Sequence, residues 1–480
     1  MEDNKKKLSL ARFRVRGLFA QFDHTIPTNS LNHVTAITAP NGSGKTVCLR
    51  LIEALFKRRW TIFTTTEFKD IVYEFSDGSS IIIKKINDLE GANAALSLFV
   101  KQDQNYELNL GHAHSGWWPK VGDIPEDALN QISRRLGFLT RFGQNAWRHD
   151  STGEAFDTQK IIEIYGDRLP VRFSKFTDEP LELKVIIDSI DCHLIETQRL
   201  FIFDADERPT YEEKYFRREA RSDAALTISF KARRLREIIR KDLAQYATIS
   251  QSLDRTFPHR FIQNKSQQNL NDIRHSLDAL DVLRNDLVGV GLLGREQHQP
   301  IDFGSDDIDD ADVRVLSVYA EDTKAKLNSL KSLHDKIKLF TEIVNARFRF
   351  KSLQIDREEG FRLVSRDRSI PLEKLSSGEQ HQLVLFFELL FELSDNALIL
   401  IDEPELSLHV AWQAKFIEDL LRVINLNEFN VILATHSPIL IGKWWDLVVQ
   451  LGDERDDDYR PDWDEYEDDY GHDNERDYGK

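Results

Sequence analysis

The chain has 480 residues, of which 41% are hydrophobic and 10% aromatic, enough apolar material for a large core and about two to four domains. Its formal net charge is -17, but residues 453–480 carry 14 acidic and 4 basic residues, a net of -10, which leaves -7 for the rest (-17 minus -10). This body is neither strongly acidic nor basic enough for charge alone to indicate a nucleic-acid partner.

The sequence predicts neither a secretory signal nor a membrane span. Residues 1–7 are charged and no apolar segment follows them, unlike a secretory signal. The apolar run at 383–393 is interrupted by glutamates, so no membrane span is predicted. Cys48 and Cys192 have no CxxC or zinc spacing, which is typical of a reducing compartment. We therefore expect a cytoplasmic protein that does not contact membranes.

The N-terminal pattern predicts strands followed by a helix. Residues 8–15 and 19–26 are expected to form two strands joined by a turn at Gly17. A β-branched strand is predicted at 33–38, and apolar positions within 47–56 then recur at helical spacing. A strand, a glycine-rich turn and a helix in this order form the context that a phosphate-binding loop needs.

The turn between that strand and helix fits the P-loop pattern, with Ala39 in place of the first glycine. Gly42 and Gly44 would let backbone N–H groups surround phosphates at the start of the helix. Lys45 would neutralise the β- and γ-phosphates, and the Thr46 hydroxyl would bind Mg²⁺. The alternative, a glycine-rich turn that matches by chance, is disfavoured by the flanking elements. The predicted nucleotide-binding residues are Asn41, Gly42, Ser43, Gly44, Lys45 and Thr46.

A β-rich segment and then a helical one follow. Residues 65–110 predict hairpins, and strands are also predicted at 183–190 and 192–195. From about 220 to 349 the apolar spacing is helical.

Three helices are predicted in this helical segment. Pro258, in the segment 254–258, is expected to end the first. Residues 289–310, rich in Gly, Gln and Asp, predict a loop. The third helix, at 312–346, would be about 50 Å long.

A second acidic site is predicted where strands return after residue 350. The apolar strand at 397–401 leads into Asp402 and Glu403. A buried strand that ends in carboxylates is typical of a ligand site at the edge of a parallel sheet. Asp402 would hold Mg²⁺ through water, and Glu403 would orient the water that attacks the γ-phosphate. The alternative is a buried strand capped by solvated acids.

The segment Leu375-Ser376-Ser377-Gly378-Glu379-Gln380 resembles the LSGGQ signature of ABC ATPases, in the LSSGEQ form of SMC-like and OLD-like ATPases. Ser377 and Gly378 precede an apolar helix, so a hydroxyl, backbone N–H groups and a helix end would form an anion cradle. In the family this cradle binds the γ-phosphate held by the opposite subunit, which implies head-to-head dimers. A plain capping box between Ser376 and Glu379 is the alternative, and both can hold together.

Three further elements match the resemblance. The segment 404–409 resembles the D-loop, which crosses the dimer interface in the family. His436, after a predicted strand at 430–434, resembles the switch histidine that contacts the γ-phosphate. Gln198 resembles the Q-loop glutamine that ligates Mg²⁺, with Gln102 and Gln104 as competitors.

The resemblance implies an α/β fold: an ABC-type P-loop ATPase head built from both chain ends, with a β-rich lobe and a helical, short coiled-coil-like insertion. It implies ATP and Mg²⁺ as ligands and hydrolysis to ADP and phosphate. The corresponding division is 1–205 and 350–452 for the two halves of the head, 206–349 for the insertion, and 453–480 for an acidic tail.

The chain also resembles ATPase subunits of bacterial antiphage systems, most of all the AriA-like ATPases of PARIS. That resemblance implies an oligomer that holds a TOPRIM-type effector nuclease and releases it when a phage protein is sensed. The segment after His436 is too short for a TOPRIM domain. We therefore expect the effector to be a separate protein.

Other interpretations stay open. An SMC-like DNA-repair ATPase would clamp DNA with basic residues in 213–241, although a solvated helix face is favoured for them. A scaffold that binds ATP without hydrolysing it is disfavoured by Glu403. The tail at 453–480 is expected to be disordered, with docking or DNA mimicry as the alternative. Strand-face arginines are equally compatible with a phosphate contact and with solvation: Arg12, Arg14 and Arg16.

Overall fold

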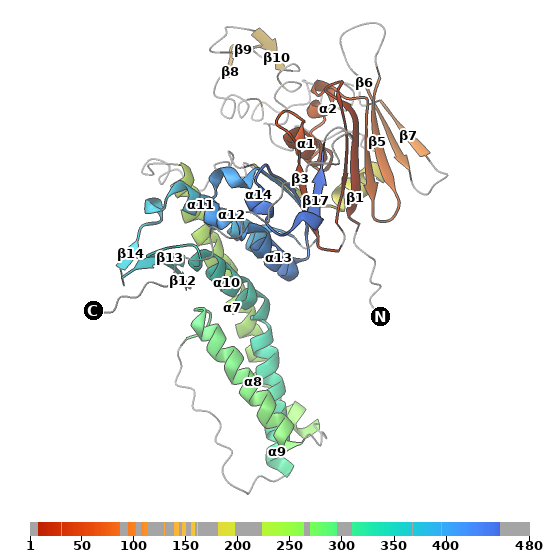
Figure 1. The fold of residues 1–480 in the computed structure, drawn as a ribbon. Helices are drawn as coiled ribbons and strands as arrows, with labels where there is room; N and C mark the ends of the chain where they lie inside the picture. Colours follow the sequence, from red (N-terminus) through yellow and green to blue (C-terminus); the bar gives the residue numbers. More distant parts are fainter. Residues whose placement is uncertain are drawn as a thin grey trace, which may run out of the picture.

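The computed structural model describes most of the chain and shows a five-stranded and a six-stranded β-sheet, two smaller three-stranded sheets, a helical layer and a projecting arm of long helices (Figure 1). The residues described are 8–29, 31–86, 95–101, 107–112, 129, 139–143, 146–149, 155–158, 161, 181–196, 223–263, 269–294, 310–366, 368–394 and 396–451.

The central sheet is parallel and combines strands from both ends of the chain. Its order is β11-β15-β16-β3-β17, and each neighbouring pair is parallel. The strands from the N-terminal half, β3 and β11, therefore pair directly with strands from the C-terminal half. This sheet establishes the predicted α/β head built from both chain ends. The strand bounds are β3 Val34–Thr38, β11 Cys192–Glu196, β15 Leu398–Asp402, β16 Asn430–Ala434 and β17 Val448–Gln450.

The two faces of this sheet pack against different helices because alternate side chains of a strand point to opposite faces. In β15, Leu398 and Leu400 belong to the hydrophobic cluster that contains the helix α1 (Lys45–Phe56). Ile399 and Ile401 belong to the cluster that contains α11 (Ser377–Phe387) and α13 (Phe416–Asn427). The helix that follows the 39–46 loop and the helix that follows the signature segment thus cover opposite faces.

An antiparallel sheet covers the outer side of α1. Its order is β2-β1-β4-β5-β6-β7, and the Tyr73 hydroxyl of β4 donates a 2.7 Å hydrogen bond to the carbonyl of Leu51 in α1. The predicted hairpin around residues 76–79 is confirmed as β4–β5. The bounds are β1 Leu10–Leu18, β2 Phe22–Pro27, β4 Asp70–Phe75, β5 Ser80–Ile86, β6 Ala95–Lys101 and β7 Glu107–His112.

Two local predictions in the N-terminal half are wrong. The β1–β2 turn lies at Phe19 and Ala20, with φ of 54° and 56°, and β1 continues through Gly17 with a register shift there. Residues 183–190 were expected to be a strand, but α5 (Leu181–Asp188) is a helix. Its buried residues Leu183, Ile186 and Ile187 follow the three- and four-residue spacing of a helix face.

Smaller elements complete this half. A short helix follows α1, and three strands form a separate antiparallel sheet in the order β10-β9-β8. The Trp147 indole N–H of β9 donates a 2.8 Å hydrogen bond to the Thr158 hydroxyl. The bounds are α2 Thr61–Thr65, β8 Leu139–Arg141, β9 Ala146–His149 and β10 Ala155–Asp157.

Four helices form the projecting arm: α7 (Asp223–Gln263), α8 (Leu270–Gly289), α9 (Asp310–Asn328) and α10 (Lys331–Asn345). The expected break at Pro258 is wrong, because α7 continues to Gln263. Side chains donate hydrogen bonds to backbone carbonyls in the turns before the proline. Thr256 Oγ1 donates to Ser252 O at 2.9 Å, and Arg260 donates to Leu253 O at 2.7 Å. Most of the expected loop at 289–310 lies outside the described residues.

The single long helix expected at 312–346 is two helices. The chain breaks at Ser329 and Leu330, where Ser329 Oγ donates to Lys326 O at 2.7 Å and so competes with the helical backbone bond. The break lets α10 pack on the head. Within the described residues, none of the helices combines the length and hydrophobicity that crossing a membrane requires.

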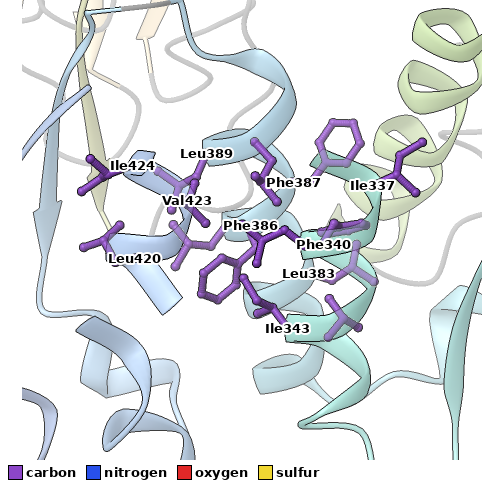
Figure 2. Close-up of a cluster of buried hydrophobic side chains, with 14 of the residues drawn as sticks. Ile337, Phe340, Ile343, Leu383, Phe386, Phe387, Leu389, Leu420, Val423 and Ile424 are labelled. Atoms are coloured by element: carbon purple, nitrogen blue, oxygen red, sulfur yellow. The ribbon is translucent and has the colours of Figure 1, made fainter. Parts of the chain in front are cut away.

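The root of the arm is built into the core of the head. Figure 2 shows Ile337, Phe340 and Ile343 of α10 against side chains of α11 and α13. Backbone contact is close at a second point, since a Cβ at Gly360 of β13 would lie 1.8 Å from the carbonyl oxygen of Ala232 in α7. The arm is therefore continuous with the helical layer on one face of the sheet.

The remaining elements belong to the C-terminal half. Residues 352–356 and 360–365 form the expected strands, and the expected helix at 378–393 ends in a π-helical segment. The expected helix at 411–424 is divided into α12 and α13. The bounds are β12 Ser352–Asp356, β13 Gly360–Ser365, β14 Arg368–Ile370, η4 Leu372–Lys374, η5 Glu388–Glu392, η6 Pro404–Ser407, α12 Val410–Gln413, α14 Pro438–Ile441 and η7 Trp445–Leu447.

Candidate nucleotide site

The predicted site residues meet at the carboxyl edge of the parallel sheet. β3 ends at Thr38 and leads into the 39–46 loop, β15 ends at Asp402, and β16 ends at Ala434 just before His436. Because all strands are parallel, these ends share one edge, which is where ligands bind in open α/β sheets. β11 ends at Glu196 on the same edge, but Gln198 lies outside the described residues.

The 39–46 loop depends on its glycines. Gly42 and Gly44 have φ of 84° and 93°, a left-handed conformation that L side chains rarely adopt. A Cβ at Gly44 would also lie 2.7 Å from Leu18 Cδ2, whereas one at Gly42 would meet nothing within 4 Å. Asn41 is exposed and Ser43 is buried. Gly44 therefore serves both the backbone turn and close packing against β1, and Gly42 serves the turn.

The Lys45 side chain folds back to the start of this loop. Its Nζ donates to the carbonyl oxygens of Ala39 at 2.8 Å and Pro40 at 3.3 Å, and the residue is only 5% exposed. Burial lowers the pKa of Lys45, while the negative charges of Glu403, Asp402 and Glu405 oppose that shift. A buried ammonium at the start of a helix is suited to an anionic ligand such as a phosphate chain.

Thr46 and Asp402 lie side by side: Thr46 Oγ1 donates to Asp402 Oδ1 at 3.1 Å. A hydroxyl and a carboxylate are the oxygen ligands that Mg²⁺ accepts, usually with phosphate oxygens and waters in the other positions. Within the described part of the chain, no cluster of three or more His, Cys, Asp or Glu side chains could hold a metal by itself. The pair fits a cation that is shared with a bound phosphate.

Glu403 and His436 form the next pair along this edge. His436 Nε2 lies 3.7 Å from Glu403 Oε1, and each side chain is about one third exposed (34% and 32%). Glu403 has φ of 46° and ψ of 53°, a conformation that costs energy for a residue other than glycine. Its backbone N–H donates to the carbonyl of Ala434 at 2.9 Å, which ties this strained turn to β16. The pair presents a carboxylate and an imidazole at the rim of the site.

Glu405 is a site residue that the sequence reasoning missed as an individual position. Its Oε1 accepts a 2.6 Å hydrogen bond from the backbone N–H of His436. Gln413 joins the same two segments, because its Nε2 donates to the carbonyl of Glu405 at 3.3 Å and its Oε1 accepts from Ser437 Oγ at 2.7 Å. The η6 segment, which resembles the D-loop, is thus linked to the His436 turn. The resemblance of this segment to the D-loop is the only feature of the sequence that points to Glu405, since the group that Glu405 contacts is a backbone N–H.

The signature segment lies apart from this set. Ser376 caps α11, and Glu379 Oε2 accepts from Ser376 N at 2.8 Å, so the capping box is formed. Lys351 Nζ holds the same carboxylate at 2.7 Å. Ser376 and Ser377 are exposed, and Gly378 is partly exposed. Since α11 and α1 cover opposite faces of the sheet, the structure does not place the signature residues in one cluster with Lys45 and Thr46.

The strand-face arginines are engaged in ion pairs. Arg12 and Arg14 contact Glu74 at 3.1 and 3.3 Å, and Arg16 contacts Asp70 at 2.5 Å. These side chains are 45%, 41% and 58% exposed, so the solvated strand face explains them without a phosphate.

One family model matches most of the chain. The family model described as AAA ATPase domain matches residues 21–441. Among the solved structures that match is the Smc head domain with an extended coiled coil, bound to the C-terminal domain of ScpA, from Pyrococcus furiosus; it is 11% identical, covers 92% of this chain and 93% of its own, and has a TM-score of 0.29. No curated protein matches.

Proposed function

Because the chain belongs to the AAA ATPase domain family, we propose that it binds ATP with Mg²⁺ at the carboxyl edge of the parallel sheet and hydrolyses it. The observation that supports this most is the convergence of Lys45, Thr46 and Asp402, in which a buried ammonium lies beside a hydroxyl–carboxylate pair 3.1 Å apart. The alternative interpretation, a buried strand capped by two solvated acids, does not explain why Lys45 is buried beside them.

Residues of the 39–46 loop hold the phosphates in this proposal. Backbone N–H groups of residues 42–46 surround the β-phosphate, and Lys45 neutralises the β- and γ-phosphates. Thr46 and Asp402 hold Mg²⁺, with Asp402 acting through water and Gln198 as a further ligand. When bound, the cation would supply positive charge to the phosphate oxygens.

Glu403 and His436 perform the hydrolytic step. Glu403 orients a water molecule for attack on the γ-phosphate and accepts its proton. His436, whose Nε2 lies 3.7 Å from that carboxylate, contacts the γ-phosphate in this proposal. Glu405 supports this arrangement by holding the backbone of His436. The strained Glu403 turn supports the assignment, since such conformations are found at active sites more often than elsewhere.

The working site is completed by a second head. Ser376, Ser377, Gly378 and Glu379 bind the γ-phosphate held by a partner copy, so two sites form when two heads meet face to face. Their exposure, and their place on the opposite face of the sheet from α1, support a role in trans over one in cis. The protein is then a homo-oligomer built from head-to-head dimers.

The wider role that we propose is that of sensor and scaffold in a cytoplasmic antiphage complex. The ATPase oligomer holds a separate effector, a TOPRIM-type nuclease, and releases it when a phage protein is sensed. The sequence resemblance to AriA-like ATPases supports this role, as does the short arm formed by α7 to α10, which contrasts with the longer coiled coils of SMC-like repair ATPases.

One experiment separates these levels of the proposal. The full chain is expressed together with its neighbouring gene product, and the purified material is assayed for ATP turnover with and without duplex DNA. We expect turnover that DNA does not stimulate and a stable complex with the neighbour. Turnover stimulated severalfold by DNA, without a bound neighbour, would instead support a DNA-repair ATPase, and absence of nucleotide binding would refute the ATPase assignment itself.

A further inference from the structure

A buried histidine outside the recognised motifs contacts the 39–46 loop. His24 lies in β2 opposite Val15 of β1, is 2% exposed, and its Nε2 lies 2.7 Å from the carbonyl oxygen of Ser43. The ring stacks on Phe22 with a centroid distance of 5.6 Å. Because a carbonyl can only accept, Nε2 carries the proton in this contact. Nδ1 is buried without a partner among the described residues, so the bond to Ser43 is what orients the ring.

The contact fixes more than one atom, because a peptide group is planar. The carbonyl of Ser43 and the N–H of Gly44 belong to the same trans peptide and point in opposite directions. When His24 holds the Ser43 oxygen on the side of the antiparallel sheet, the Gly44 N–H is directed to the other side. That N–H stands at the start of α1, immediately before Lys45.

Nothing in Gly44 itself fixes this orientation. Glycine adopts positive and negative φ about equally well, so the Ser43–Gly44 peptide can rotate as a unit at little steric cost. The loop needs the glycine, because a Cβ at Gly44 would clash with Leu18, and it therefore also needs an external hold on the peptide. His24 is a buried donor in reach of the Ser43 oxygen.

We propose that His24 is a positioning residue for the nucleotide: it locks the Ser43–Gly44 peptide so that the Gly44 N–H faces the phosphates. The inference rests on the proposed function, because it concerns the loop that would bind ATP. His24 does not touch the substrate in this account. It acts through the backbone, and it prepares the anion site before nucleotide arrives.

The test compares three variants of the full chain. His24→Phe keeps an aromatic ring but cannot donate, His24→Gln keeps an N–H donor at a similar reach, and Thr25→Ala changes the exposed side of the same strand. Affinity for ADP and ATP is measured by calorimetry, together with kcat and KM and the unfolding temperature without nucleotide. Without His24 the Gly44 N–H would no longer be held toward the charged phosphates. Since a hydrogen bond to a charged group is worth roughly tenfold to a hundredfold in affinity, His24→Phe should weaken binding by about that factor.

The comparison of affinity and kinetics among the three variants decides whether the proposal holds. We expect His24→Gln to recover most of the affinity, Thr25→Ala to match the wild type, and His24→Phe to raise KM with kcat nearly retained, because the lost bond acts on the bound and transition states alike. Equal affinity in His24→Phe and wild type would overturn the proposal, and so would equal weakening in the Phe and Gln variants, which would indicate packing alone. His24→Leu is the second non-donating variant if His24→Phe does not fold. A wild type that binds no nucleotide refutes the proposed function instead.

Discussion

Thr46 donates a 3.1 Å hydrogen bond to Asp402, although the two residues are 356 positions apart in the chain. The bond joins the helix that follows the 39–46 loop to the end of β15, and so it connects the N-terminal half of the head with the C-terminal half. The parallel sheet brings Lys45 of the N-terminal half and Glu403 of the C-terminal half to the same edge. The candidate site therefore exists only when both ends of the chain have folded together.

Removing the Thr46 hydroxyl should weaken nucleotide binding only when Mg²⁺ is present. In Thr46→Ala the cation loses a ligand, and we expect affinity for ADP in MgCl₂ to fall about tenfold, as for the loss of one hydrogen-bonding partner of a charged group. Affinity in EDTA should stay near the wild-type value. Thr46→Ser, which keeps the hydroxyl, is the control. An equal loss in both buffers would indicate damage to the loop and not to a metal site.

The charge of Lys45 should be visible in the pH dependence of binding. Burial lowers its pKa below the ordinary value of 10.5, and a bound phosphate favours the charged form. As pH rises through the lowered pKa, binding must take up a proton, and the affinity should fall by up to about tenfold per pH unit. The fall should thus begin below pH 10.5, at a pH where a free lysine is still charged.

A matched variant isolates this effect. Lys45→Arg keeps its charge at alkaline pH, so its affinity, although weaker in absolute terms, should not decline over the same range. Titration of a fluorescent ADP analogue at several alkaline pH values measures both proteins. An identical decline in wild type and Lys45→Arg would show that another group is responsible.

Glu403→Gln should separate binding from hydrolysis. The amide keeps the size of the side chain but cannot accept the proton of the attacking water, so turnover should fall by about 10²- to 10³-fold. ATP affinity should change little. Glu428→Gln is a matched control, because Glu428 is an exposed glutamate that also has a left-handed backbone, with φ of 48°. Full turnover in Glu403→Gln would rule out the assigned role.

Docking of the arm on the head should depend on one buried ion pair. Arg347, just after α10, contacts Asp419 of α13 at 2.5 Å, and the side chains are 5% and 13% exposed. Asp419→Ala would leave the guanidinium buried without its partner, which should cost about 3–5 kcal/mol in the free energy of unfolding. Urea denaturation measures this loss. Arg234→Ala, which removes the exposed pair with Glu237, should cost less than about 1 kcal/mol.

Local patterns predicted the parts of the fold in which neighbours along the chain decide the structure. The strand before the 39–46 loop, the helix after it and the hairpin around residues 76–79 are all confirmed. The strand predicted at 183–190 is wrong because its apolar residues fit both a strand and a helix face over so short a run. Pro258 was expected to end the first helix, but α7 continues through it to Gln263, and side-chain hydrogen bonds to Ser252 O and Leu253 O add contacts in the preceding turns.

Contacts that depend on tertiary structure could not be predicted in the same way. Glu405 and His24 act on backbone groups of His436 and Ser43, and a backbone partner leaves no trace in the sequence. The break at Ser329 lies just before α10, whose apolar residues pack into the core of the head. Motif residues such as Thr46 and Asp402 could be paired from sequence because their chemistry requires both. Gln198 and the tail at 453–480 lie outside the described residues, so those expectations stay predictions.

The central claim, that each triphosphate lies between the 39–46 loop of one copy and the Ser377–Gly378 cap of another, is tested most directly by mixing two inactive variants. Lys45→Ala disables the loop, and Ser377→Arg blocks the cap. In a mixed dimer one of the two sites combines the intact loop of one chain with the intact cap of the other. If the chains exchange freely, the mixture should recover about a quarter of wild-type ATP turnover, since half of the dimers carry one such site. A mixture that remains as inactive as its components, although exchange is shown by a tagged pull-down, would contradict the account.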